Sequence, residues 1–280
     1  MEVSLRTGSA SGIQIVFLSF AVILLAVPLS RAISGALECT DAVADAIGRS
    51  VPFFLGIVVL AAFPQLRARA IAYLSKPIPE GRRTEVAIVA VAKVFFAFSF
   101  FGALALWYWL TQGSAALEQA LKPAAPEKAY AEAFSWPTMF INLAMGAIVA
   151  PVVEEILFRG LLFDAWAERW GAFVATVLTS ALFAAYHPHF FATFTSGVIF
   201  VCVVRRTGTL WGSIAVHSFF NLMLWYPLAG RFGMPDPERA IGDISTWGFN
   251  LACLLLAAMA LPVYVWMAVR HPYPRPTEID

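Results

Sequence analysis

Long stretches without a charged residue alternate with short charged segments along the whole chain. A transmembrane helix needs about 20 mainly apolar residues to cross the hydrocarbon core of a bilayer. Most of the uncharged stretches approach or exceed that length, and no segment between them is long enough for a soluble domain. The pattern therefore predicts an all-α, polytopic integral membrane protein. The uncharged stretches are residues 7–30, 50–66, 94–117, 133–153, 170–204, 207–230 and 244–269.

The stretch 170–204 is too long for a single crossing. As one helix it would extend roughly 52 Å at about 1.5 Å per residue, against a hydrocarbon core of about 30 Å. Pro188 is the expected break, because proline lacks the backbone N–H that a helix interior requires. Counting two spans here gives about eight transmembrane helices, of which the one over 190–204 is short.

Composition agrees with this prediction and excludes two other classes of protein. Of the 280 residues, 60% are hydrophobic and 13% are charged, whereas soluble domains carry about 25% charged residues. The formal net charge of +1 does not indicate the basic surface of a nucleic-acid-binding protein. The 3 cysteines, Cys39, Cys202 and Cys253, are scattered and suggest neither a disulfide framework nor a thiolate metal site.

The distribution of Lys and Arg predicts the orientation of the chain. Placing the N-terminus inside the cell puts about twice as many of these residues on the inner side as on the outer side, and the segment 65–84 contributes most. We therefore expect both termini in the cytoplasm. Residues 13–29 exceed the usual length of a signal-peptide core, so we expect a retained first span rather than cleavage. Lys93 lies inside the third span, and its long side chain is expected to reach the inner surface.

Three charged residues follow the stretch 133–153 directly, in Glu154-Glu155-Ile-Leu-Phe-Arg159. A charge in the middle of a bilayer costs about 2.5–3.5 kcal/mol, so such residues are functional candidates. On a helix, Glu155 and Arg159 are four positions apart and can neutralise each other. Glu154 points about 100° away from Glu155 and has no local partner. A purely structural ion pair would explain Glu155 and Arg159 but not Glu154.

Two histidines and an asparagine occupy later spans. His187 stands four residues after Phe183, and His217 stands four residues before Asn221. His217 and Asn221 therefore share one face of their helix. A lone histidine in an apolar helix is usually a hydrogen-bonded core residue, so each histidine by itself favours a structural role. His189 is a weaker companion, because it follows the expected helix break and would lie near the outer surface.

The spacing along the chain predicts that these groups meet at one depth in the membrane. Glu154 and His187 are equally far from Trp170-Gly171, where a turn is expected, so an antiparallel hairpin brings them level. Glu154 and His217 each lie roughly 15 Å from the nearest charged inner segment, at about 1.5 Å per residue. Unrelated polar residues in a core would have no reason to converge in this way.

Together, these groups suit the hydrolysis of an amide or ester within the membrane. A carboxylate beside a histidine can hold and deprotonate a water molecule, as Glu154 and His187 would do here. A second histidine and an amide NH₂ can donate to the oxyanion that forms, which gives that role to His217 and Asn221. A zinc ion held by Glu154, His187 and His217 is an alternative, because one carboxylate and two imidazoles are adequate ligands.

The three motifs resemble those of a known family. Glu-Glu-x-x-x-Arg, Phe-x-x-x-His and His-x-x-x-Asn follow one another on successive hydrophobic helices. This ordered set is similar to that of the CPBP family of intramembrane proteases, which groups type II CAAX prenyl endopeptidases (Ras-converting enzyme) with bacterial bacteriocin-processing and immunity proteins. The resemblance implies that Glu154 and His187 act on water and that His217 and Asn221 form the oxyanion site. It implies supporting, structural roles for Glu155, Arg159 and Phe183.

The resemblance also gives expectations about organisation, substrate and location. N-terminal spans and an outer loop would occupy 1–134, a catalytic core 135–230, and a last span with a cytoplasmic tail 231–280. The expected partner is a membrane-associated protein or peptide, either a prenylated CAAX protein or another lipid-anchored or hydrophobic one. The expected location is a bacterial inner membrane. The family has been described both as glutamate-type and as metal-dependent, so Zn²⁺ stays open as a cofactor.

Two non-enzymatic functions are alternatives. One is an immunity or partner-binding membrane protein, and the other is a proton-coupled transporter that uses Glu154 and the histidines as a relay. Many transporters are built from repeats with discontinuous helices in both halves. The polar motifs of this chain lie only in its second half, which disfavours a transporter.

Overall fold

The computed structural model describes residues 29, 32–33, 35–36, 41–113, 115, 140–141, 143–187, 190–225 and 244–273. Within these ranges the protein is helical and contains no β-strand, so the predicted all-α class is confirmed for them. The predicted first span over 7–30 falls almost wholly outside the described residues, and Cys39 and His189 lie outside them.

The helices are of three kinds. Most are α-helices, one short 3₁₀-helix precedes α4, and π-helices lie on both sides of α8. In chain order they are α2 (Asp41–Ala62), α3 (Pro64–Leu74), η1 (Glu80–Arg82), α4 (Arg83–Gln112), η2 (Met145–Val149), α8 (Ala150–Glu154), η3 (Glu155–Leu162), α9 (Phe163–Ala185), α10 (Phe190–Thr207), α11 (Leu210–Trp225) and α14 (Ile244–Arg270).

Several described helices have the length and composition of membrane spans. Phe190–Thr207 and Ala252–Arg270 are each long and apolar enough to cross, and α2 with α3 makes a third if that pair is one bent span. The bend of 105° lies at Phe63, whose backbone is extended (φ −98°, ψ 106°). A residue before proline is pushed out of the α region, so Pro64 explains the bend.

The long uncharged stretch is divided as its sequence predicts. α9 ends at Ala185 and α10 begins at Phe190, on either side of the predicted break. Inside α9, Gly171 has φ 82° and ψ 159°, a conformation that glycine adopts readily because it has no Cβ. The expected turn is therefore confirmed at Gly171. The rings of Phe158 and Phe183 lie 5.3 Å apart between centroids, so the two arms of the hairpin pack side by side.

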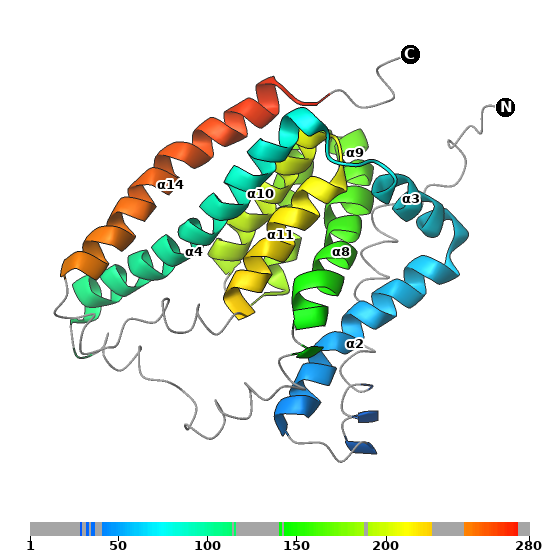
Figure 1. Cartoon of the computed structure of the whole chain (residues 1–280), viewed down its shortest axis with the longest axis horizontal. Helices are drawn as coiled ribbons and strands as arrows, with labels where there is room; N and C mark the ends of the chain where they lie inside the picture. The colour runs from blue at the N-terminus through cyan, green and yellow to red at the C-terminus, as the bar shows by residue number, and fades with distance from the viewer. Residues whose placement is uncertain are drawn as a thin grey trace.

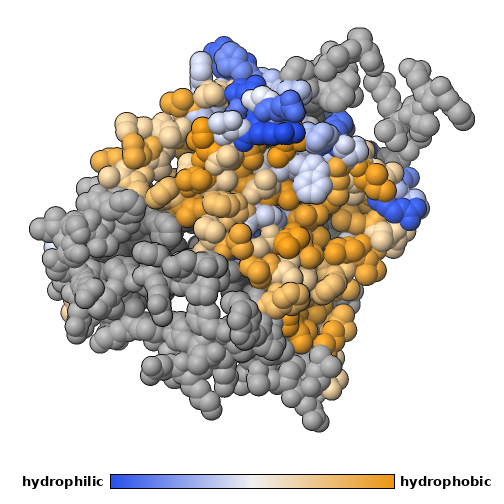
Figure 2. Space-filling view, viewed as in Figure 1, coloured by the Kyte–Doolittle hydropathy of each residue, from blue (hydrophilic) through white to orange (hydrophobic). Residues whose placement is uncertain are grey.

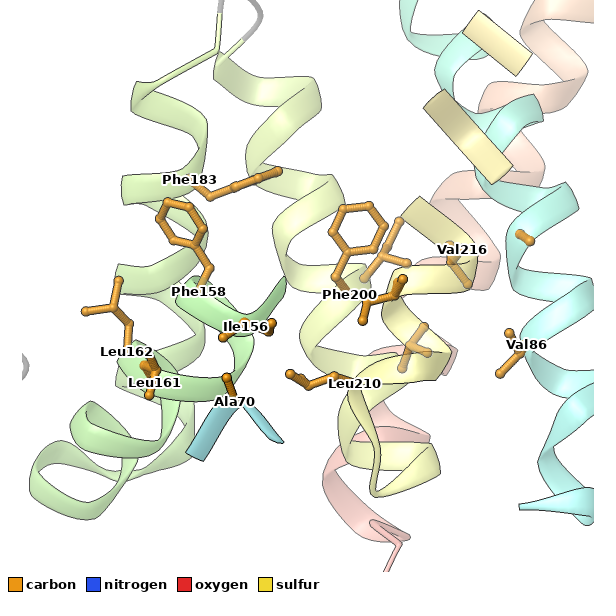
Figure 3. Packing of buried hydrophobic residues seen from close by; sticks show 14 of the residues in the cluster. Ala70, Val86, Ile156, Phe158, Leu161, Leu162, Phe183, Phe200, Leu210 and Val216 are labelled. Carbon is orange, nitrogen blue, oxygen red and sulfur yellow. The ribbon is translucent and has the colours of Figure 1, made fainter. Parts of the chain in front are cut away.

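The helices form a bundle around one main hydrophobic cluster. In Figure 1, α14 lies along α4 at one edge, α2 and α3 lie at the opposite edge, and α9, α10 and α11 lie between them. Buried apolar side chains of α3, α4, η3, α9, α10 and α11 make up the cluster shown in Figure 3. α9 and α10 approach closely at Gly197, where a Cβ would stand 2.9 Å from the Cα of Ser180.

Hydrophilic residues gather at one end of the bundle, where α4 begins and α14 ends (Figure 2). Arg206 donates from Nε and Nη2 to Glu85, at 2.8 and 3.1 Å, and from Nη1 to the carbonyl of His271 at 2.7 Å. The backbone N–H of Tyr273 donates to the carbonyl of Arg205 at 2.7 Å. Three segments that the charge distribution assigns to the inner side therefore meet at the same end.

Candidate active site

The acidic motif lies where α8 passes into the π-helix η3. Glu154 is the last residue of α8, and Glu155 is the first residue of η3. A π-helix forms i→i+5 hydrogen bonds, and such widened turns occur frequently at functional sites. Pro151, just after η2, has no N–H to donate to Ala147 in an α-helical bond, which favours wider turns there. We expected a regular α-helix from Glu154 to Arg159, and that expectation is wrong because Glu155 to Arg159 lie in a π-helix.

Glu155 and Arg159 nevertheless form the ion pair that their spacing predicts. Arg159 Nη1 lies 3.3 Å from Glu155 Oε1, and the two side chains are 1% and 0% exposed. His217 Nδ1 lies 3.1 Å from the same carboxylate oxygen. The Glu155 carboxylate thus links the first residue of η3 to Arg159, four residues further along, and ties that helix to α11.

Three phenylalanine rings surround the Arg159 guanidinium. Its Cζ atom lies 4.2 Å from the ring centroid of Phe183, 5.0 Å from that of Phe200 and 5.8 Å from that of Phe158. These rings gather between η3, α9 and α10 in Figure 3. Because the face of an aromatic ring attracts a cation, the rings offset part of the cost of burying Arg159.

Glu154 lies between the two histidines of the predicted site. His217 Nε2 is 3.6 Å from Glu154 Oε2, and His187 Nε2 is 4.0 Å from Glu154 Oε1. The Glu154 side chain is 14% exposed, whereas that of Glu155 is 0% exposed. The structure therefore brings together the three groups that the spacing predicted to converge, and it leaves Glu154 as the more accessible acid.

The backbone fixes the orientation of the His187 ring. His187 Nδ1 lies 2.8 Å from the carbonyl oxygen of Phe183. A carbonyl oxygen only accepts, so Nδ1 donates, and the Nε2 of the neutral ring presents its lone pair toward Glu154. The ring of Phe183 lies 4.5 Å from that of His187 and 5.9 Å from that of His217. The Phe183 ring thus contacts both histidine rings.

Asn221 makes a contact that the sequence did not predict. Its Nδ2 donates to the backbone carbonyl of Gly146, inside η2, at 2.7 Å. The residue expected to bind an oxyanion therefore also ties α11 to the first π-helix. An amide NH₂ group carries two hydrogens, so one bond to Gly146 leaves the group able to donate a second.

Phe200 is a site residue that the sequence analysis missed. Its ring stacks on that of His217, with centroids 4.6 Å apart and an angle of 21° between the planes. Phe200 lies in α10, a span that carries none of the three polar motifs. Nothing in its sequence position distinguishes it from other phenylalanines, so only the packing of α10 against α11 shows its role.

Lys93 is the second missed residue, and its expected position is wrong. It does not reach the inner surface: the residue is 3% exposed, and Nζ lies 3.4 Å from the centroid of the Phe220 ring. Lys93 follows Val86 and Ala90 along the buried face of α4. Those residues are spaced at i, i+4 and i+7, which is the spacing of one helix face. That spacing is a signal which the sequence already contained.

The zinc site suggested for Glu154, His187 and His217 is not formed in the described part of the chain. Among the residues that the structure describes, there is no group of three or more His, Cys, Asp or Glu side chains placed to hold a metal ion. His217 Nδ1 is engaged with Glu155, so His217 could offer only its Nε2 to a metal ion. We therefore derive no chemical step through a metal.

Comparison with known proteins finds similarity in the segment that contains the site. Residues 136–223 match the family model described as type II CAAX prenyl endopeptidase Rce1-like. The chain is 32% identical over 84 residues to "Putative membrane peptidase YdiL" of Bacillus subtilis. The matched segment covers 29% of this chain and 34% of that protein. It is 30% identical over 92 residues to "UPF0177 protein YbdI" of Lactococcus lactis. This match covers 31% of this chain and 49% of that protein.

These matches confirm the resemblance noted on the motifs. The matched segment 136–223 includes Glu154, His187, His217 and Asn221. The chain spans about a third to a half of the length of the two relatives. No solved structure matches the chain significantly.

Proposed function

We propose that this protein is an intramembrane endopeptidase that hydrolyses a peptide bond of a membrane-associated protein or peptide. The observation that carries the proposal is the position of Glu154, which lies within 3.6 Å of His217 and 4.0 Å of His187 in a largely buried site. The Rce1-like match over the same segment supports this chemistry.

In the proposed mechanism, Glu154 and His187 bind and activate one water molecule. Glu154 takes a proton from the water as its oxygen bonds to the carbonyl carbon of the substrate. The protonated Glu154 then gives that proton to the leaving amine as the carbon–nitrogen bond breaks. Because His187 is held through Nδ1 by the Phe183 carbonyl, its Nε2 is directed at the water without rearrangement.

His217 and Asn221 are proposed to stabilise the oxyanion. In its protonated form, His217 can donate from Nε2 to the oxyanion while Nδ1 donates to Glu155. The second N–H of Asn221 would donate beside it. Donors held in place before the reaction stabilise developing charge more effectively than mobile ones, and the bonds to Glu155 and Gly146 provide that fixation.

We also propose the finer organisation of the chain. Residues 135–230 would form the catalytic core, 1–134 the N-terminal spans, and 231–280 the last span and tail, with about eight spans in total. Both termini would face the cytoplasm of a bacterial inner membrane, which the gathering of charged residues at one end of the bundle supports (Figure 2). The substrate would be a prenylated CAAX protein or another lipid-anchored or hydrophobic peptide.

The test is cleavage by the purified protein in proteoliposomes prepared in H₂¹⁸O. We expect a panel of membrane-anchored peptides to yield a product whose new C-terminal carboxyl group contains one ¹⁸O atom. Glu154→Gln should abolish this incorporation, while Glu80→Gln, a change of an exposed glutamate in η1, should not. Full activity of Glu154→Gln would contradict the proposed mechanism. Loss of activity with a strong chelator and recovery with Zn²⁺ would replace it with a metal-bound water.

A further inference from the structure

Lys93 presents a buried ammonium group beside the proposed site, outside the three motifs. It lies on α4, and the residue is 3% exposed. Its Nζ lies 3.4 Å from the centroid of the Phe220 ring on α11. Val86 and Ala90, on the same face of α4, are also buried, so the direction of the Lys93 side chain follows from helix packing.

The surroundings of Lys93 do not compensate its charge within the part of the chain that the structure describes. There, the ring of Phe220 is the contact found for Nζ, and no carboxylate lies within ion-pair distance of it. A buried ammonium without a counter-charge costs several kcal/mol, and a desolvated cation–π contact returns about 2 kcal/mol. Arg159, by contrast, is paired with Glu155. Lys93 is therefore suited to receive an anionic group from outside the chain.

Lys93 lies close enough to His217 on α11 to interact with it electrostatically. Phe220, which Lys93 contacts, stands three residues after His217, and residues at that spacing are neighbours on a helix surface. α11 packs against α4 on one side and against η2 and η3 on the other. His217, a proposed oxyanion donor, thus has an acidic neighbour, Glu154 on α8, and a basic neighbour, Lys93 on α4.

We propose that the ammonium group of Lys93 binds a carboxylate of the peptide substrate and so selects and orients that peptide. This proposal rests on the proposed peptidase function. A carboxylate is the anionic group that a peptide itself supplies, and its single negative charge matches the single ammonium found here among the described residues. With the carboxylate on the α4 side, the cleaved bond would lie toward Glu154, which fixes the direction of the peptide in the site.

The test measures binding separately from cleavage. In a Glu154→Gln background, the full chain in a nonionic detergent is titrated with a dansylated four-residue apolar peptide that has a free C-terminal carboxylate. The same peptide with a C-terminal amide is the comparison. Lys93→Met should weaken binding of the carboxylate peptide about 10- to 100-fold and leave binding of the amide peptide unchanged. Lys93→Arg should retain part of the preference for the carboxylate.

Lys76→Met is the matched control, because Lys76 is exposed and contributes only its backbone carbonyl to a bond with Thr209. It should not change either affinity. A purely structural role of Lys93 would lower the thermal stability of Lys93→Met, whereas the proposal expects stability at least equal to that of the parent. Equal weakening of both peptides, or no binding of the carboxylate peptide by the parent protein, would overturn the proposal.

Two further arms identify the source of the carboxylate. If a side-chain carboxylate is recognised, an amide peptide that carries one glutamate will bind in a Lys93-dependent manner. If the C-terminal carboxylate is recognised, the free-acid peptide without glutamate will bind in this manner. Competition by phosphatidylglycerol, with no difference between acid and amide peptides, would instead indicate a lipid phosphate and overturn the proposal. Lys93-dependent binding without cleavage of any peptide by the unmodified protein would contradict the peptidase function alone.

Discussion

Two clusters in this molecule both combine glutamate with arginine but differ in how completely their hydrogen bonds are formed. The end cluster consists of Glu85, Arg82 and Arg206 at the charged end of the bundle. Arg206 donates to both oxygens of Glu85, and Arg82 Nη1 donates to Glu85 Oε2 at 2.7 Å. The remaining Nη1 of Arg206 donates to the backbone of His271. The bonds of this cluster therefore join α4, α10 and the segment that follows α14 to one another.

The inner cluster consists of Glu154, Glu155, Arg159, His187 and His217. Arg159 is 2% exposed, yet none of its side-chain nitrogens has a hydrogen-bond partner among the described residues. Its ion-pair distance to Glu155 is 3.3 Å. Glu154 approaches its two histidines at 3.6 and 4.0 Å, which is longer than a hydrogen bond.

The difference separates a structural cluster from a reactive one. Buried polar groups in proteins are almost always hydrogen-bonded, and an exception calls for a specific explanation such as a catalytic role. The end cluster directs its donors at other helices and so fastens the bundle. The inner cluster keeps unused hydrogen-bonding capacity at the place where a water molecule and a peptide would bind. Glutamate and arginine occur in both clusters, so the presence of these two residue types does not separate them, whereas hydrogen-bond satisfaction does.

The sharpest test of this comparison is the same substitution at the two glutamates. Glu154→Gln should lower kcat for peptide cleavage about 10⁴-fold, because it removes the general base, and should leave the melting temperature nearly unchanged. Glu85→Gln should lower the melting temperature and leave kcat within a few-fold. Both are measured on purified protein in the same detergent. A tenth or more of the parent activity in Glu154→Gln would remove the distinction.

Glu155→Gln tests whether the ion pair inside the inner cluster is structural. The change leaves the Arg159 charge buried without its counter-charge, so we expect a loss of about 3–5 kcal/mol in the free energy of unfolding. Glu155→Gln combined with Arg159→Met removes both charges and should recover most of that loss. Denaturant titration in mixed micelles measures the coupling. Equal destabilisation of the single and double variants would show that the two residues do not stabilise each other.

Asn221→Ala separates the two roles of that side chain. Loss of an oxyanion donor should lower kcat about 100-fold with little change in KM. Loss of the bond to Gly146 should cost about 1 kcal/mol of stability. Steady-state kinetics and thermal unfolding of the same preparation distinguish these effects. A stability loss without a change in kcat would assign Asn221 to the structure of the bundle only.

The smallest effect is expected from acid at the end cluster. Burial of Glu85 disfavours its charged form, but the bonds and charges of Arg206 and Arg82 outweigh burial and hold its pKa below the ordinary value. The stability that this carboxylate contributes is therefore present above the pKa of the unfolded chain, about 4.3, and is lost as the pH falls through the lower pKa of the folded state. We expect about 1–2 kcal/mol from this source.

Thermal unfolding of the parent and of Glu85→Gln across acidic pH measures this contribution. The difference between their melting temperatures should be largest near neutral pH and should shrink as Glu85 becomes protonated. A difference that grows with acidity would contradict the sign of the linkage.

Much of the fold follows from the sequence because the turns are local. Gly171 adopts a conformation that suits glycine, and the break between α9 and α10 lies where Pro188 predicts it. Once both turns are fixed, equal distances along antiparallel helices bring Glu154 level with His187. The convergence of the site was therefore predictable by counting residues.

The features that the sequence did not predict depend on the direction in which a side chain points. Regular helical periodicity gives no sign of the π-helices η2 and η3, which form where i→i+5 bonds replace the α-helical ones. The stacking of Phe200 on His217 depends on how α10 rotates against α11. Lys93 was misplaced because snorkelling was assumed from its length, although the burial of α4 directs it inward.

The sequence by itself indicated that this chain is a helical membrane protein. It also showed which few charged and polar residues lie within apolar stretches, where the membrane disfavours them. That information is one-dimensional, because it rests on the position of each charge along an apolar stretch. The tertiary structure decided which partner each of those residues has. It paired Glu155 with Arg159, left Glu154 between two histidines, and placed the Lys93 ammonium against the ring of Phe220. The reason is that partners and hydrogen-bond directions depend on the rotation of each helix about its axis, which only packing against its neighbours fixes.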